Sequence, residues 1–257
     1  MSRSKVLVDE ALVLRTIPFG DTSQVVHLAT PEHGLVAALA KGAHRPGSEV
    51  EGGLVAFSQG TAWWSPPPRR AREDEEGLAL LKRFRQRDSW RRLASDLERY
   101  RAACYVLELV RLWMRPQLPL PALYRAAVTA LRALAVAPRE QVGTWVLWFE
   151  ARALAAAGHR PALEGCGACG QPLQGTLVFA PAAGGCAHAR CASSGAQRRL
   201  TTTGLAALRR LYTQRLQELA AEPPAPASVR LLRSLHDLWI PWTLERRPHA
   251  LEHLPRS

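Results

Sequence analysis

The chain has 257 residues, with 34 basic against 22 acidic side chains, a formal net charge of +12 and a sequence pI near 10.5. Hydrophobic residues make up 47% and charged residues 22% of the chain, a composition that excludes a wholly disordered protein. No stretch reaches the ~18 uninterrupted apolar residues of a membrane span, and the first nine residues lack the apolar core of a signal peptide. We therefore expect a cytoplasmic protein with no membrane partner. The basic excess favours a polyanion, above all nucleic acid.

The first 80 residues are predicted to be β-structure. Short apolar runs at 11–14, 25–28, 35–39, 54–57 and 61–64 are separated by turn-forming segments rich in Gly and Pro. Five short strands within about 65 residues, with no helical period among them, match a small closed barrel of the OB-fold type. We predict that residues 1–80 form a DNA-binding OB-fold domain.

The period changes after residue 88. Apolar residues from there to 114 recur at three- and four-residue steps, which predicts a long helix, and further helices are expected at 122–136, 138–157, about 202–221 and 227–244. The helices before and after 164–192 are expected to pack into one bundle. The predicted fold class is α+β, an N-terminal OB-fold barrel followed by a helical domain (81–163 and 193–257) into which an element at 164–192 is inserted.

Four of the five cysteines lie in that inserted element. Cys166 and Cys169 are two residues apart, and Cys186, His188 and Cys191 follow. Pairs of ligands at this spacing hold a tetrahedral ion, so we predict a structural Zn²⁺ site with Cys166, Cys169 and Cys191 as ligands. The fourth ligand stays open, because the two-residue spacing favours His188 and thiolate affinity favours Cys186. Four protein ligands leave no position for a catalytic water.

The candidate DNA-contacting residues are basic. They are Arg15, Lys41, Arg45, Arg69, Arg70, Lys82, Arg83, Arg85, Arg87, Arg91 and Arg92. Those between 69 and 92 lie where barrel and bundle are expected to join, and this segment either contacts phosphates or is a solvated linker. Trp63 and Trp64 are neighbours in a predicted strand and must point to opposite faces, so at least one belongs to the core and the other is a candidate stacking platform for an unpaired base.

Several catalytic patterns are absent from the sequence. There is no GxxxxGK[ST] phosphate-binding loop, HExxH or GxSxG motif, nor carboxylates clustered at metal-binding spacing. We therefore expect a protein that is not an enzyme and has no catalytic residues.

Four stretches carry a resemblance to a known family. They are 11–15 with 19–21, 30–34 leading into 40–43, 148–150 running to 158–161 ahead of the first cysteine pair, and Gly184-Gly185 ahead of the second. In this order they resemble the bacterial recombination-mediator family RecO. In that family the double glycine is followed by two residues, Cys, two residues and Cys. This register places His188 where the family has cysteine, and Cys186 at a usually apolar position.

The resemblance implies an OB-fold, a helical domain and a zinc-binding element. It also implies binding of single- and double-stranded DNA, annealing of complementary strands, and a role with RecR, and in some bacteria RecF, in loading RecA onto strands coated by single-stranded-DNA-binding protein (SSB), at the nucleoid. The acidic, apolar-ended tail of SSB would need a basic-rimmed hydrophobic groove, which we expect on the helical domain. The alternatives are a zinc-ribbon transcription or RNA-binding factor, and an enzyme such as a nuclease with an unrecognised site.

Overall fold

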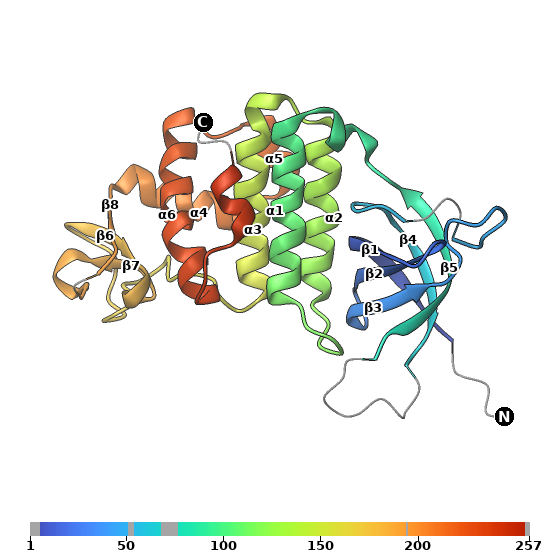
Figure 1. Ribbon diagram of the computed structural model, residues 1–257. Coiled ribbons are helices and arrows are strands. Elements are labelled where there is room, and N and C mark those ends of the chain that lie inside the picture. Colours follow the sequence, from blue (N-terminus) through green and yellow to red (C-terminus); the bar gives the residue numbers. More distant parts are fainter. Residues whose placement is uncertain (1–5, 51–53, 68–76, 194, 255–257) are drawn as a thin grey trace.

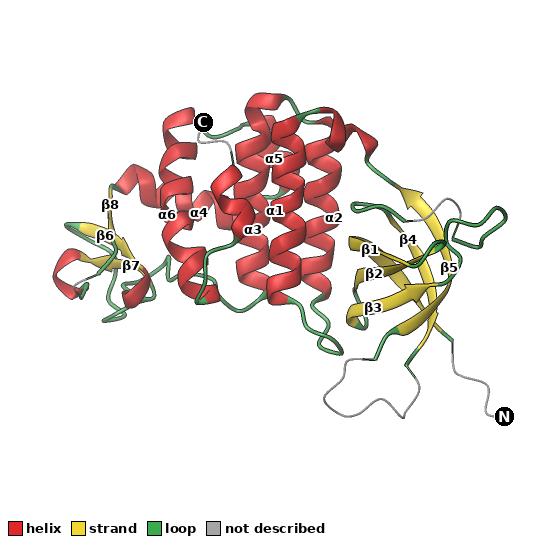
Figure 2. Ribbon diagram, in the orientation of Figure 1, coloured by secondary structure: helices red, strands yellow, loops and turns green. Residues whose placement is uncertain are grey.

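The computed structural model describes residues 6–50, 54–67, 77–193 and 195–254. Figure 1 shows a β-barrel at one end of the molecule, a helical bundle in the middle and a small β-element at the other end. Figure 2 shows that this last element extends beyond α6 and α4, away from the barrel. The α+β class and the order of barrel, helices and insert are therefore as the sequence predicts.

Five strands form the closed barrel. They are β1 (Leu7–Phe19), β2 (Ser23–Thr30), β3 (Gly34–Ala40), β4 (Gln59–Ser65) and β5 (Ala79–Asp88). The order around the barrel is β1-β2-β3-β5-β4, and every pair is antiparallel except β3 with β5. Alternate side chains such as Val13, Val26, Trp64 and Phe84 fill the interior. The predicted five-stranded OB-type barrel is confirmed, and so is the burial of one of the two neighbouring tryptophans.

One predicted strand is wrong and another was missed. Residues 54–57 are not a strand, because Phe57 has φ +72° and turns its ring onto Tyr100 of the bundle, with the ring centroids 5.8 Å apart. The fifth strand is β5, in the segment expected to join barrel and bundle. Its outward arginines alternate with inward Leu81 and Phe84, across a register shift near Trp64. The predicted boundary at residue 80 falls inside this strand.

The bundle has six helices in the part of the chain that the structure describes. They are α1 (Leu97–Trp113), α2 (Pro121–Val136), α3 (Val142–Ala156), α4 (Thr202–Thr213), α5 (Leu216–Ala221) and α6 (Pro226–Leu244). The first helix begins later than expected, because Trp90 has φ +37° and a 3₁₀ turn at Arg91–Ser95 precedes the Asp96 N-cap. The helix predicted at about 202–221 is two helices, since Gln214 adopts an extended backbone. No described helix is long and apolar enough to cross a membrane.

A buried ion-pair network joins three helices of the bundle. Glu150 of α3 is fully buried and accepts hydrogen bonds from the Tyr105 hydroxyl of α1 (2.7 Å) and from Arg233 of α6 (2.7 Å). Its other oxygen lies 2.8 Å from Nδ1 of His236. Burial opposes ionisation, but Arg233 and His236 hold the pKa of Glu150 below its ordinary value. The network therefore fixes α6 against α1 and α3.

The barrel packs directly on the bundle. Leu12 and Leu14 of β1, Ala29 of β2 and Phe57 belong to the same apolar cluster as the helices. The outer face of one barrel wall is therefore covered, whereas the β4–β5 wall carries exposed arginines.

Candidate metal centre and nucleic-acid interface

The inserted element is a small sheet with one face on the bundle and the other on the cysteine cluster. It contains β6 (Leu177–Ala180), β7 (Gly185–His188) and β8 (Arg198–Leu200), in the order β7-β6-β8. Phe179 pairs with Cys186, and both join the apolar core of the bundle. Val178 pairs with Ala187, and both pack with Cys166 in a separate small cluster. The sheet thus separates the bundle core from the cysteine cluster.

Four potential ligands meet on the outer side of the sheet. The ligand atoms of Cys166, Cys169, His188 and Cys191 all lie within 4.8 Å of one another. Nδ1 of His188 is 3.6 Å from Sγ of Cys169 and 3.7 Å from Sγ of Cys191. A tetrahedral ion with metal–sulfur and metal–nitrogen bonds of about 2.3 and 2.0–2.1 Å places S and N about 3.6 Å apart. This Cys3His group could therefore hold a metal ion without rearrangement.

The histidine is oriented for coordination. Its Nε2 lies 3.0 Å from the Pro172 carbonyl oxygen. A carbonyl oxygen can only accept, so Nε2 carries the proton and the lone pair of the neutral ring is on Nδ1, which faces the thiols. A hydrogen bond of this kind fixes both tautomer and ring orientation in metal sites.

Backbone hydrogen bonds favour the thiolate form of one cysteine. Burial opposes ionisation of Cys166, but backbone N–H groups of Cys169, His188 and Ala168 hold the pKa of Cys166 at about 6. By contrast, burial and the neighbouring Cys169 and Cys166 raise the pKa of Cys191. An ionised Cys166 therefore opposes ionisation of Cys191, and a cation bound between the two sulfurs would remove this conflict.

Cys186 lies outside this group. Its side chain is fully buried against the bundle, and burial raises its pKa to about 12, so the thiol stays protonated near neutral pH. Of the two candidates for the fourth position, the structure groups His188 with the three other cysteines.

The β4–β5 wall gathers part of the predicted basic set. Arg83, Arg85 and Arg87 occupy alternate, exposed positions of β5, and Lys82 is exposed beside them. The guanidinium of Arg83 lies 5.4 Å from the ring centroid of Trp63, its partner across the strands. Trp63 is half-buried on the outside of the barrel.

A groove runs between β5 and the loop that follows β3. We call it the barrel groove; its volume is about 510 Å³ and it is lined by Gly47, Ser48, Glu49, Leu54, Arg83, Phe84, Arg85 and Gln86. Nε of Arg83 is 3.1 Å from a carboxylate oxygen of Glu49. Arg85 makes no ion pair with any described residue.

The remaining predicted residues do not meet in this groove. Arg15 lies on the β1–β2 wall opposite His27, and Lys41 and Arg45 are exposed at the end of β3 and in the following loop. Arg91 and Arg92 are exposed in the 3₁₀ turn after β5, and Arg87 pairs with Glu10 at 2.8 Å. Arg69 and Arg70 lie outside the described residues.

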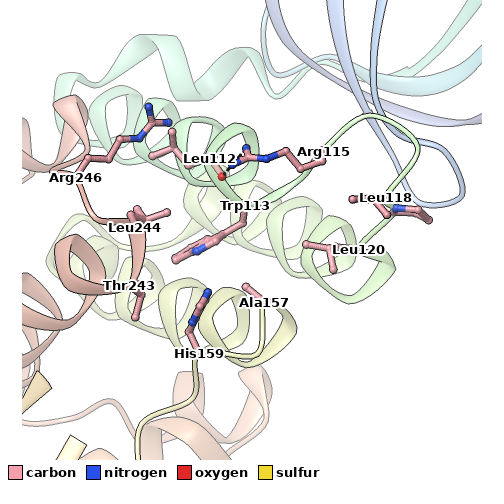
Figure 3. Close-up of a pocket in the computed structure, with 11 residues that line it drawn as sticks. Leu112, Trp113, Arg115, Leu118, Leu120, Ala157, His159, Thr243, Leu244 and Arg246 are labelled. Carbon is pink, nitrogen blue, oxygen red and sulfur yellow. Dashed lines mark hydrogen bonds between the residues drawn. The ribbon is translucent and has the colours of Figure 1, made fainter. Parts of the chain in front are cut away.

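Sequence reasoning assigned no residues to a second groove, on the bundle. We call it the bundle groove; it has a volume of about 790 Å³, and its lining includes Leu112, Trp113, Arg115, Leu118, Leu120, His159, Leu244 and Arg246. In Figure 3 the Trp113 indole lies between the loop after α1 and the end of α6. None of the described residues that line it is acidic. The lining residues come from separate parts of the chain, so no local sequence pattern identifies the groove. The prolines at 116–121 indicate only where a helix ends.

Comparison with protein families and relatives agrees with this architecture. The family model for "Recombination protein O N terminal" matches residues 1–73, and that for "Recombination protein O C terminal" matches residues 94–252. A protein described as DNA repair protein RecO in Anaeromyxobacter dehalogenans 2CP-1 is 34% identical over 257 residues, 99% of this chain and 96% of the relative.

Two further relatives carry the same description. The protein of Rhodopirellula baltica is 32% identical over 85% of this chain and 76% of its own length. That of an Exiguobacterium species is 33% identical over 89% of this chain and 87% of its own. Both matched domains and the full-length relatives lead to one conclusion: the chain belongs to the RecO family of DNA repair and recombination proteins, which is not enzymatic.

Proposed function

We propose that this protein is a recombination mediator that binds single- and double-stranded DNA and anneals complementary strands. With RecR, and with RecF where it is present, it would help to load RecA onto SSB-coated DNA in the cytoplasm, at the nucleoid. The observation that carries the proposal is the barrel groove, which is lined by Arg83 and Arg85 and whose Arg83 also lies over the ring of the outward Trp63.

The groove suits a polynucleotide backbone. Guanidinium groups neutralise phosphates and release counterions, which gives affinity without base readout. Among the described residues of the lining the only acidic group is Glu49, and it is in an exposed pair that phosphate can displace. Trp63 adds a π-face on which an unpaired base can stack. Neutralising two strands together lowers their mutual repulsion, so annealing needs no ATP.

We propose that the Cys3His group binds Zn²⁺ in a structural role. Three thiolates and one imidazole are the donor set of structural zinc sites, and the spacing of the donor atoms fits a tetrahedral ion. The ion would join the turn at 166–169 to the end of β7 and supply no reaction chemistry. A zinc-ribbon factor that reads sequence has a similar ligand set, but nothing in the described barrel favours it.

We propose that the bundle groove receives the acidic, apolar-ended tail of SSB. Leucine and tryptophan side chains line its floor, and Arg115, His159 and Arg246 stand among them without an acidic neighbour in the lining. The Nε1–H of Trp113 has no hydrogen-bond partner among the described residues. Apolar side chains at the end of a peptide would fill the groove while the arginines pair with its carboxylates.

Annealing of complementary strands precoated with SSB, across a salt series, tests the mediator role. We expect Arg85→Glu to slow annealing and to weaken DNA binding. The matched control is Arg230→Glu, the same charge change at an exposed residue of α6 far from the barrel (Figure 1). Equal effects of both variants would contradict the barrel groove. A strong dependence on DNA sequence would favour a transcription factor, and divalent-metal-dependent cleavage a nuclease.

A further inference from the structure

We infer that the β2–β3 turn of the barrel is a positioning element for the bundle groove, so that ligand binding on the helical domain depends on a barrel residue that never touches the ligand. The inference rests on the proposed binding of an acidic, apolar-ended peptide in that groove.

The turn is joined to the groove wall through the backbone. The Leu35 N–H donates to the Arg115 carbonyl oxygen (3.2 Å), and the Gln117 N–H donates to the His33 carbonyl oxygen (3.1 Å). Gly34 and Pro116 are partners in an isolated antiparallel bridge. The loop between α1 and α2 therefore extends the β2–β3 hairpin by a short strand-like contact.

The turn itself is held firmly by the barrel. One carboxylate oxygen of buried Asp9 accepts from the Glu32 N–H (2.9 Å) and lies 3.1 Å from Nδ1 of His33. The Thr30 hydroxyl donates to the Gly34 carbonyl oxygen across the turn (3.0 Å). These hydrogen bonds anchor the turn to β1 and β2, in addition to its contacts with residues 114–120.

The groove wall depends on this support. Residues 114–120 lie between two helices, and Arg115, Leu118 and Leu120 of this loop line the groove. Gln117 has φ +58°, a conformation that is unfavourable for a residue with a side chain and must be maintained by its surroundings. The hydrogen bond from its N–H to the turn supplies one such constraint.

Gly34 makes the close approach possible. Its φ is +73°, and a Cβ at this position would lie 2.2 Å from the Arg115 carbonyl oxygen, against 3.4 Å or more in ordinary contact. Any side chain would push the groove wall away from the barrel. Because the colliding atom is backbone, the displacement passes to Arg115 and Leu118, which line the groove.

Two glycine substitutions separate this effect from backbone strain. Gly34→Ala introduces both the strain of a positive φ and the collision. Gly20→Ala, in the β1–β2 turn of the same barrel, introduces the strain alone, because Gly20 has φ +61° and nothing within 4 Å of its Cβ position. His33→Ala is a milder variant that removes the anchor to Asp9 without a collision, and it serves where Gly34→Ala does not fold.

The test measures the binding of a labelled oligo-aspartate peptide with an apolar C-terminus to full-length variants by fluorescence anisotropy. We expect Gly34→Ala to weaken binding on the order of tenfold or more, His33→Ala less, and Gly20→Ala by about twofold or less. Deuterium uptake of residues 114–120 should rise in Gly34→Ala and stay unchanged in Gly20→Ala. Equal peptide affinities in Gly34→Ala and Gly20→Ala would overturn the inference.

The two proposals fail in different ways. If the wild-type protein does not bind the peptide, the proposed occupant of the bundle groove is wrong. The positioning role is then decided by deuterium uptake alone, and unchanged uptake of residues 114–120 in Gly34→Ala, or in His33→Ala where it replaces that variant, overturns it.

Discussion

Glu49 restrains one of the two arginines in the barrel groove, and its removal should strengthen DNA binding. In Glu49→Gln the guanidinium of Arg83 loses its carboxylate partner and becomes free to contact phosphate. The two side chains are 56% and 67% exposed, so their ion pair is worth at most about 1 kcal/mol. Releasing it should therefore raise the affinity for single-stranded DNA up to about fivefold.

The variants of the two arginines sharpen this prediction. Arg85 has no ion-pair partner among the described residues. Arg85→Gln should therefore reduce the slope of log binding constant against log salt concentration by about 0.7, the contribution of one phosphate contact in single-stranded DNA. Arg83→Gln should flatten it less in the wild-type background and by about 0.7 in the Glu49→Gln background. The effects of Glu49→Gln and Arg83→Gln on the free energy of DNA binding should not add, and the difference measures the coupling between the two residues.

Fluorescence anisotropy of a labelled oligothymidine across a sodium chloride series measures both the DNA affinity and its dependence on salt. Glu252→Gln is the matched control, since it also frees an arginine, Arg247, from an exposed pair (3.5 Å; 50% and 64% exposed). Glu252 lies in the 3₁₀ turn at His249–His253 and Arg247 lies just before it, both outside the barrel. If Glu49→Gln changes DNA affinity no more than Glu252→Gln does, the barrel groove does not carry the DNA.

Three further predictions concern the bundle and its insert. Glu150→Ala should cost about 3 kcal/mol in urea unfolding, because it breaks a buried ion pair and leaves Arg233 with the half-exposed Asp237 as its one charged partner among the described residues. Since the folded-state pKa of Glu150 lies below the ordinary 4.5, its contribution is present at neutral pH and is lost as the pH falls below that value. Removal of metal by a chelator, or Cys166→Ala, should lower the thermal stability of the C-terminal half more than the DNA affinity; the opposite ranking would mean that the insert contacts DNA. Elemental analysis should find metal lost in His188→Ala and kept in Cys186→Ala, and metal lost in Cys186→Ala alone would reverse the assignment.

The grouping of Cys166, Cys169 and Cys191 could be predicted from the sequence because its geometry is local. A turn of two residues between ligands is almost enough to aim both at one ion, so Cys166 and Cys169 could be identified without a fold. The choice between Cys186 and His188 could not be made this way. It depends on which side of a short sheet each residue faces, and Cys186 is drawn to the bundle by its strand partner Phe179.

The β5 error has a different physical origin. A strand at the surface of a barrel needs only a few inward apolar residues, and here they are Ala79, Leu81 and Phe84 beside four basic residues. The apolar run at 54–57 has the stronger hydrophobic pattern, but Phe57 contributes its ring to the interface with the bundle instead. Tertiary contacts outweighed the local pattern in both places, between barrel and bundle for Phe57 and within the barrel for β5.

The net positive charge indicates binding to nucleic acid, but it overestimates the number of DNA phosphates that the protein contacts, because several arginines form contacts within the fold. Arg233 neutralises a buried carboxylate, Arg152 donates to the Tyr212 carbonyl oxygen at the end of α4 (2.7 Å), and Arg209 donates to the Leu163 carbonyl oxygen beside the insert (2.9 Å). These groups hold helices together and cannot release counterions to DNA.

The slope of log binding constant against log salt concentration reports only the phosphates that the protein contacts. A formal charge of +12 would give a slope of magnitude near 8 if every excess charge contacted single-stranded DNA, at about 0.7 for each contact. A barrel groove with two arginines requires a much smaller value, and a large one would mean that the DNA path extends from the barrel onto the helices.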